Sequence, residues 1–220
     1  MIVNKKKIIE TTIEFVKQTL KGDSTGHDWY HIERVWKMAK YIAQKEKNVD
    51  LFVIELAALL HDIADWKFQG GDDTVSSKVA AEWLIKQSVD KKTVDHVSEI
   101  AHHISFKGAK VKNEIKTLEG KIVQDADRLD AMGAIGIARV FATGSKFNTV
   151  IYDPTSKPTM HKSFNDYKTH QSSSINHFYE KLLLLKDMMN TKTGKKLAQN
   201  RHKFLEDYLK EFLFEWNGKI

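Results

Sequence analysis

Helix-breaking residues are scarce in this chain, and that scarcity limits its fold more than any other feature of the sequence. The 220 residues include only two prolines and eleven glycines. A β-rich fold with many tight turns needs these residue types at short intervals. The few breakers therefore favour long helices, and the apolar residues recur at the three- and four-residue spacing that helices require.

This apolar spacing predicts helices over most of the chain. They are expected at Ile8–Leu20, Ile32–Ile42, Leu51–Ile63, Val75–Ile85, Val94–Ile104, Leu118–Phe141 (broken by Gly133 and Gly136), Ser174–Met189 and Lys195–Trp216. Residues 144–162 lack the pattern and hold both prolines, so we expect a long functional loop there. The sequence thus predicts a single all-α domain, a helical bundle of roughly eight or more helices.

Composition also limits the chemistry. The chain contains no cysteine, which excludes disulfides, thiolate zinc sites, cysteine nucleophiles and iron–sulfur clusters. Any metal ion must therefore be bound by His, Asp, Glu and water. No uncharged apolar run is long enough to span a bilayer, and the N-terminal MIVNKKKIIETTIEF is interpreted as an amphipathic helix, not a signal peptide. We therefore expect a cytoplasmic protein without membrane contact.

The formal net charge is +6. Nucleic-acid binding is one interpretation, but the lysines are spread along the chain and do not form a basic block, so we do not expect it. A modest positive field also suits an enzyme that acts on polyanionic small molecules. A solvated, lysine-rich surface is an equally good explanation.

Two motifs place metal-capable side chains on or beside apolar helices. His31 shares a helical stripe with Val35 and Met38, although a single histidine on such a stripe is more often a core residue than a ligand. His61 and Asp62 follow the apolar run that ends at Leu60, about 100° apart on a helix. Adjacent imidazole and carboxylate groups at a helix end suit a divalent transition metal. The alternative is a helix that simply reaches solvent.

Two further segments carry polar residues in apolar surroundings. IAHHISF embeds His102 and His103 among apolar residues, and a structural role and a ligand role are equally good explanations. In QDADRLDAMGAIGIARVF, Asp127 and Asp130 lie on one otherwise apolar helical stripe. Buried carboxylates are costly unless they are paired or bind a metal. Neutralisation by nearby arginines, Arg128 and Arg139, is the alternative.

Taken in chain order, these residues form the series His31, His61-Asp62 and Asp127. With the segments HDWYH, AALLHDIADWKF, IAHHISF and QDADRLDAMGAIGIARVF, this series resembles the HD superfamily of metal-dependent phosphohydrolases. The resemblance is to its small single-domain bacterial branch, the YpgQ/YedJ-like proteins, and extends from about residue 24 to the C-terminus. It implies an HD-type domain over residues 1–220, with a metal core at about 24–143, the loop 144–162 and C-terminal helices over 163–217.

The resemblance also implies a function. Family members use a divalent metal to hydrolyse phosphate esters or anhydrides, and this branch is associated with nucleoside triphosphate (NTP or dNTP) pyrophosphohydrolase activity. A metal-activated water would release the monophosphate and pyrophosphate. Mn²⁺ is favoured, and Mg²⁺, Co²⁺, Ni²⁺, Fe²⁺ and Zn²⁺ are the other candidates.

Roles for individual residues follow from the resemblance. The metal ligands would be His31, His61, Asp62 and Asp127, with Asp62 and Asp65 as the catalytic carboxylates and Asp65 acting on the attacking water. The candidates for substrate binding are Arg34, Lys67, His102, His103 and Arg128. The loop 144–162 would cover a nucleotide, with Tyr152 available to stack on its base.

The sequence leaves other functions open. One alternative is a phosphodiesterase or nucleotidase that acts on other phosphate esters. Another is a non-catalytic sensor that binds a nucleotide through a metal. The expected partner is a nucleotide or another phosphorylated small molecule, and the sequence leaves a homodimer open.

Overall fold

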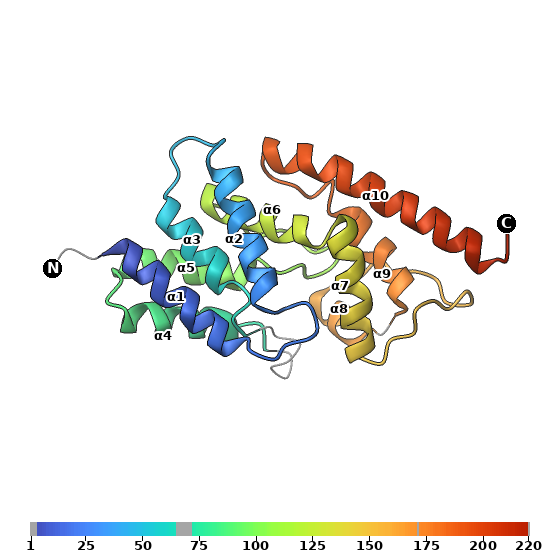
Figure 1. Ribbon diagram of the computed structural model, residues 1–220, viewed down its shortest axis with the longest axis horizontal. Coiled ribbons are helices and arrows are strands. Elements are labelled where there is room, and N and C mark those ends of the chain that lie inside the picture. The colour runs from blue at the N-terminus through green and yellow to red at the C-terminus, as the bar shows by residue number, and fades with distance from the viewer. Residues whose placement is uncertain (1–3, 65–71, 171, 220) are drawn as a thin grey trace. The chain divides into compact units, whose positions relative to one another are not determined.

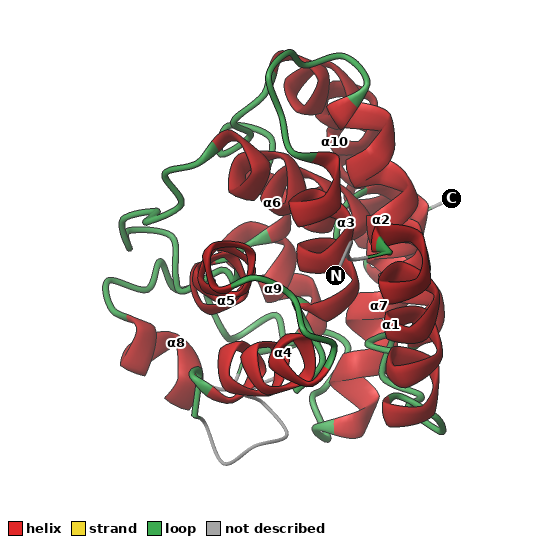
Figure 2. Ribbon diagram, turned by 90° about the vertical axis from the view of Figure 1, so that its left-hand side faces the viewer, coloured by secondary structure: helices red, strands yellow, loops and turns green. Residues whose placement is uncertain are grey.

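The computed structural model describes residues 4–64, 72–170 and 172–219. Its elements are, in chain order, α1 (Lys5–Thr19), α2 (Trp29–Ala43), α3 (Leu51–Leu60), α4 (Val75–Lys86), α5 (Lys91–His103), α6 (Leu118–Asp130), α7 (Gly133–Lys146), α8 (Phe164–Thr169), α9 (Ser174–Glu180), the 3₁₀ helix η2 (Leu182–Leu184) and α10 (Lys192–Trp216) (Figure 1). Within the described ranges there are helices and loops but no strand (Figure 2). The all-α prediction is confirmed.

Contacts between residues divide the chain into two compact units. The first comprises Met1–Phe106 with Asn113–Ala126, and the second comprises Lys107–Lys112 with Asp127–Ile220. The boundary falls inside α6, so this helix contributes residues to both units. The assignment of residues 1–220 to one HD-type domain stays a prediction.

Helix α3 forms the centre of the first unit. Eight of its ten residues are buried, from Phe52 to Leu60 with Glu55 the exception. Helices α1, α2 and α5 all pack on α3, and α4 packs on α5. A helix that is apolar on nearly every face is stable only when neighbours surround it. This central helix therefore provides a rigid support for the residues that follow it.

In the second unit, α7 packs against α9 and α10, and η2 also contacts α9 and α10. The aromatic side chains of Phe178 and Tyr208 stack with ring centroids 5.7 Å apart, and Phe141 lies against both. Tyr152 contacts Phe212 and Trp216 edge-on. Aromatic contacts thus join the loop after α7 to α10.

Several boundaries differ from the predicted ones. The third helix ends at Leu60 and not at Ile63, so His61 is its C-terminal cap and Asp62 lies in a turn. Helix α6 ends at Asp130 and α7 begins at Gly133, which has a backbone φ of +68°, whereas Gly136 lies inside α7. The helix expected over Ser174–Met189 leaves helical geometry at Lys181.

The six-residue helix α8 was not predicted from the sequence. Ser163 begins it, because its side chain accepts a hydrogen bond from the backbone N–H of Asp166. A helix this short has no repeating apolar stripe from which periodicity could identify it. Because α7 ends at Lys146 and α8 begins at Phe164, the loop between them covers residues 147–163 and not 144–162.

Candidate metal centre

Packing and one hydrogen bond position His61. It caps α3 directly after the buried apolar run, and its side chain is almost fully buried. The ring Nδ1 lies 2.9 Å from the carbonyl oxygen of Ala58. A carbonyl only accepts, so Nδ1 must carry the proton and donate it. The buried Nε2 is therefore the nitrogen with a lone pair for a ligand.

His31 lies on the neighbouring helix α2, which Asp28 begins by accepting a hydrogen bond from the backbone N–H of His31. The side chain has no exposed surface. Its ring centroid is 5.3 Å from that of His61, and its Nε2 is 3.7 Å from Asp62 Oδ2. Two helices thus bring the first two predicted ligands together with Asp62.

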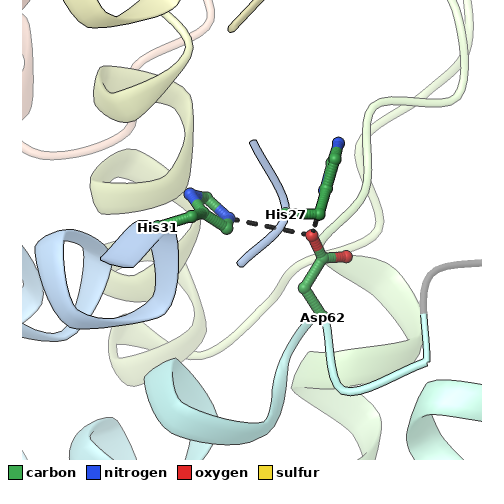
Figure 3. A group of neighbouring side chains, drawn as sticks. All are labelled: His27, His31 and Asp62. Carbon is green, nitrogen blue, oxygen red and sulfur yellow. Dashed lines mark hydrogen bonds and ion pairs between the residues drawn. The ribbon is translucent and has the colours of Figure 1, made fainter. Parts of the chain in front are cut away.

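His27 completes the group, and the sequence did not identify it. Its Nδ1 lies 2.7 Å from Asp62 Oδ2, and Figure 3 shows its ring and that of His31 both linked to this carboxylate. His27 precedes the cap of α2 and lies in a loop, so the helical stripe that identifies His31 does not apply to it. The one sequence feature that could have identified His27 is its position next to the capping residue Asp28 in HDWYH.

The side chains present suit a divalent ion. His27, His31 and Asp62 each offer one ligand atom, and these atoms lie within 4.8 Å of one another. Imidazole nitrogen and carboxylate oxygen are the ligand types that bind divalent transition metals in a protein without cysteine. The cluster includes two of the predicted ligands, His31 and Asp62, and places His27 in contact with the Asp62 carboxylate.

The ionisation of Asp62 reflects this environment. Burial alone would raise the pKa of its carboxyl group. The charge and hydrogen bond of His27, with the charges of His61 and His31, outweigh burial and lower that pKa well below its usual value. Asp62 is therefore a carboxylate at neutral pH, as metal binding requires.

The other predicted residues of the first unit lie on α2 and α5. Arg34 is half-buried on α2, three residues after His31. His102 and His103 are the last two residues of α5 and are half-buried. His103 Nδ1 lies 2.9 Å from a carboxylate oxygen of Glu114. Asp65 and Lys67 lie outside the described residues.

The second unit contains the predicted residues of α6. Asp127 lies on this helix as the first residue of its second-unit part, and its role as fourth ligand stays a prediction. Arg128 is buried and donates a hydrogen bond to the carbonyl of Met188. Asp130 forms an ion pair with Arg139 at 3.1 Å. For Asp130, the pairing alternative considered from the sequence is thus correct.

Comparison with known proteins agrees with this geometry. The HD domain family matches residues 28–132, a range that includes His31, His61, Asp62 and Asp127. The chain is 41% identical over 201 residues to the uncharacterized protein YpgQ of Bacillus subtilis, covering 90% of this chain and 88% of YpgQ. This chain belongs to the HD superfamily of hydrolases. The family and enzyme predictions are confirmed at this level.

Solved structures are similar over nearly the whole chain. An HD-superfamily hydrolase of Bacillus thuringiensis is 44% identical, with a TM-score of 0.72, and covers 98% of this chain and 100% of its own. A Lactobacillus plantarum protein is 33% identical, with a TM-score of 0.88 and full coverage of both chains. YpgQ in complex with ADP is 36% identical with a TM-score of 0.72, covering 94% of each chain.

Among the helices of the described residues, none has an apolar stretch long enough to cross a membrane.

Proposed function

We propose that this HD-superfamily hydrolase cleaves nucleoside triphosphates between the α and β phosphates and releases the monophosphate and pyrophosphate. The observation that carries the proposal is the group of His31, His61 and Asp62 at the end of α3, where His31 Nε2 lies 3.7 Å from Asp62 Oδ2 and the two imidazole centroids are 5.3 Å apart. A nucleotide substrate is supported by YpgQ, 36% identical, whose structure was solved in complex with ADP.

In this proposal the metal ligands are His31, His61, Asp62 and Asp127. Two neutral imidazoles and two carboxylates offset the charge of a dication and leave positions open for water and substrate. A divalent ion bound there would lower the pKa of a water molecule and offset negative charge on the phosphoryl group. The hydrogen bond from His61 to Ala58 keeps Nε2 directed to the ion.

His27 is proposed as the positioning residue for Asp62. Its Nδ1–H donates to Asp62 Oδ2 over 2.7 Å, which fixes the carboxylate orientation and supports its negative charge. Partners of this kind commonly orient metal ligands in proteins. His27 therefore acts through Asp62 and does not need to touch the substrate.

Binding of the phosphates is assigned to basic side chains near the ligands in the sequence. Arg34, Lys67 and Arg128 are the candidates, because arginine forms paired hydrogen bonds with phosphate. The guanidinium of Arg128 also donates a hydrogen bond to the carbonyl of Met188. His102 and His103 complete the proposed substrate site, and Asp65 is proposed to act on the attacking water.

Mn²⁺ is the proposed metal. Mixed oxygen and nitrogen ligation suits it, although the intrinsic affinity of such sites rises toward the later metals Co²⁺, Ni²⁺ and Zn²⁺. Mg²⁺ and Fe²⁺ are the remaining candidates. A cytoplasmic location and a homodimer also remain predictions.

A product analysis tests the proposed function. The metal-free protein is incubated with a panel of nucleotides and with Mn²⁺, Mg²⁺, Co²⁺ or Ni²⁺, and the products are identified by mass. We expect monophosphate and pyrophosphate, with the highest rate in Mn²⁺. Orthophosphate as the only inorganic product would instead indicate a nucleotidase, and binding without any product would indicate a sensor.

The Asp62→Ala variant tests the site itself. We expect it to lose hydrolysis by more than about 100-fold, because even residues that only support metal ligands commonly contribute 10- to 100-fold. Far-UV circular dichroism should show unchanged helix content. The matched control is Asp95→Asn on the exposed surface of α5, which should retain full activity. Full activity in Asp62→Ala would show that the metal assignment is wrong.

A further inference from the structure

Three metal-capable side chains come together in the second unit, and none of them has a role in the proposed hydrolysis. His161, His170 and Glu180 each offer one ligand atom, and these atoms lie within 4.8 Å of one another. The two imidazole rings have centroids 4.9 Å apart, and His170 Nε2 is 3.9 Å from Glu180 Oε1. We name these three residues the His161 cluster.

The partners of the Glu180 carboxylate offset only part of the free-energy cost of burying its charge. Its side chain is 2% exposed, and Oε1 accepts hydrogen bonds from the backbone N–H of Thr159 (2.9 Å) and the hydroxyl of Ser172 (3.0 Å). Throughout the described chain, no Lys or Arg forms an ion pair with Glu180, and His170 lies beyond hydrogen-bond distance. A buried carboxylate with neutral donors alone is costly. A cation between the carboxylate and the two imidazoles would remove that cost.

The local backbone holds the cluster in place. The carbonyl oxygen of His161 accepts a hydrogen bond from Lys110 N–H at 3.1 Å, and the ring of Tyr167 lies 5.6 Å from that of His161. The bonds from Thr159 and Ser172 orient the Glu180 carboxylate in the way that supporting partners orient metal ligands. The three donors therefore come from a loop, the end of α8 and the end of α9, already close together.

We infer that His161, His170 and Glu180 form a second divalent-metal site, of the type that binds zinc. Two histidines and one glutamate with a further position open to water are a ligand set that Zn²⁺ uses in proteins. The His170 side chain is 35% exposed, which provides a path for the ion from solvent. A bound ion would link the segment before α8 and the end of α8 to α9.

Zinc binding to the full-length chain tests this inference. The background variant His61→Ala/Asp62→Ala removes two of the ligands proposed for the hydrolytic site. After equilibrium dialysis against Zn²⁺, elemental mass spectrometry should find about one ion per chain in this background. Adding His170→Ala or Glu180→Gln should reduce bound zinc at least about tenfold, because each change removes one of three protein ligands.

His202→Ala is the matched control. His202 also lies beside a glutamate, with Nε2 3.3 Å from Glu206 Oε1, but it is not part of the His161 cluster. It should leave bound zinc unchanged. Far-UV circular dichroism verifies the fold of each variant, and loading with Co²⁺ should give a visible absorption band that disappears with His170→Ala.

Two results would overturn the inference. One is a background variant that retains no zinc, and the other is zinc binding that His170→Ala and Glu180→Gln both leave unchanged. If the background variant does not fold, the parent chain answers the same question, because His170→Ala should then reduce its zinc content by one ion. Nucleotide hydrolysis is not a readout of this experiment, so its outcome is independent of the proposed function.

Discussion

At His61, one hydrogen bond decides which ring nitrogen can bind a ligand. Ala58 belongs to the same helix, so the bond from Nδ1 forms whenever the end of α3 forms. The local backbone therefore sets the tautomer of His61, and α2 then brings the His31 ring within 5.3 Å of it. Because these side chains already hold their positions before an ion binds, they need to move less when it does.

The His27→Ala substitution tests how much a single hydrogen bond contributes to metal binding. It removes the hydrogen bond to Asp62 and leaves His31, His61 and the carboxylate in place. We expect the affinity for Mn²⁺ to fall about 10- to 100-fold, the usual effect of losing a partner of a metal ligand. Isothermal titration calorimetry measures this affinity.

His96→Ala is the control for His27→Ala. His96 contacts Thr117 on another part of the first unit and should leave the Mn²⁺ affinity unchanged. Equal affinities for parent and His27→Ala would contradict the positioning role.

Helix boundaries depend on single polar residues more than on the apolar pattern. Asp28, Asp50 and Asp90 begin α2, α3 and α5, and each accepts a hydrogen bond from a backbone N–H of the first turn. These N–H groups have no partner inside the helix, so a carboxylate cap stabilises the start of the helix and interacts favourably with its dipole. Asp28 matters most for the metal site because it caps α2 three residues before His31.

Asp90→Ala tests a cap at the element scale. We expect the free energy of unfolding to fall by about 1 kcal/mol in urea denaturation at neutral pH. Bonds to Thr93, first its backbone N–H, lower the pKa of Asp90 in the folded protein. The stabilisation is therefore complete above the unfolded pKa of about 3.9 and is lost as pH falls through the lower folded value.

The stability difference between parent and Asp90→Ala should accordingly shrink in acid. The control is Asp95→Ala on the same helix, where an exposed pair with Lys91 is removed and a change within about 0.5 kcal/mol is expected. A difference that grows as the pH falls would contradict the capping explanation.

Gly136 shows that a position inside a helix can also depend on steric contact. A Cβ atom at this position would lie 2.3 Å from the carbonyl oxygen of Ala131, which belongs to the backbone and cannot rotate away. We expect Gly136→Ala to lower the free energy of unfolding by about 3 kcal/mol, at the upper end for overpacking. Gly22→Ala is the comparison. A Cβ atom at Gly22 would meet nothing within 4 Å, so only the backbone strain at φ +89° applies. We expect this strain to lower the free energy of unfolding by about 1–2 kcal/mol. Equal losses in the two variants, measured by chemical denaturation, would exclude the steric explanation.

At the scale of the whole molecule, each compact unit presents a cluster of histidine and carboxylate groups. The first unit contains His27, His31 and Asp62, and the second contains the His161 cluster. In each cluster, side chains from different elements hold a buried carboxylate or imidazole in position. Metal binding should therefore be linked to the stability of the folded chain.

Manganese should stabilise the folded protein. At a free concentration about 100 times the dissociation constant, a ligand that binds only the folded state adds about 2.7 kcal/mol. We expect this gain in urea denaturation of the parent chain with Mn²⁺ relative to EDTA. Asp95→Asn should show the same gain, whereas His61→Ala/Asp62→Ala should show a smaller one, limited to any Mn²⁺ that binds at the His161 cluster. An equal gain in that double variant would mean that Mn²⁺ binds elsewhere.

The sequence by itself determined the helical class and supplied the prediction of the principal ligands. Scarce breakers and apolar spacing predict α1 to α7 and α10 closely, because helix formation depends on residues near each other in the chain. The placement of His61 and Asp62 after an apolar run, with His31 before it, likewise depends on local spacing and on family resemblance. These residues belong to the range that the HD domain family matches.

Only the tertiary structure brought in His27, because 35 residues separate it from Asp62 and it lies in a loop where helical periodicity carries no information. The same reason applies to His161, His170 and Glu180, which come from a loop and the ends of two short helices. Periodicity predicts which face of a helix is buried, but it does not predict which loops meet. Those contacts depend on how helices pack, and packing is decided by the whole chain at once.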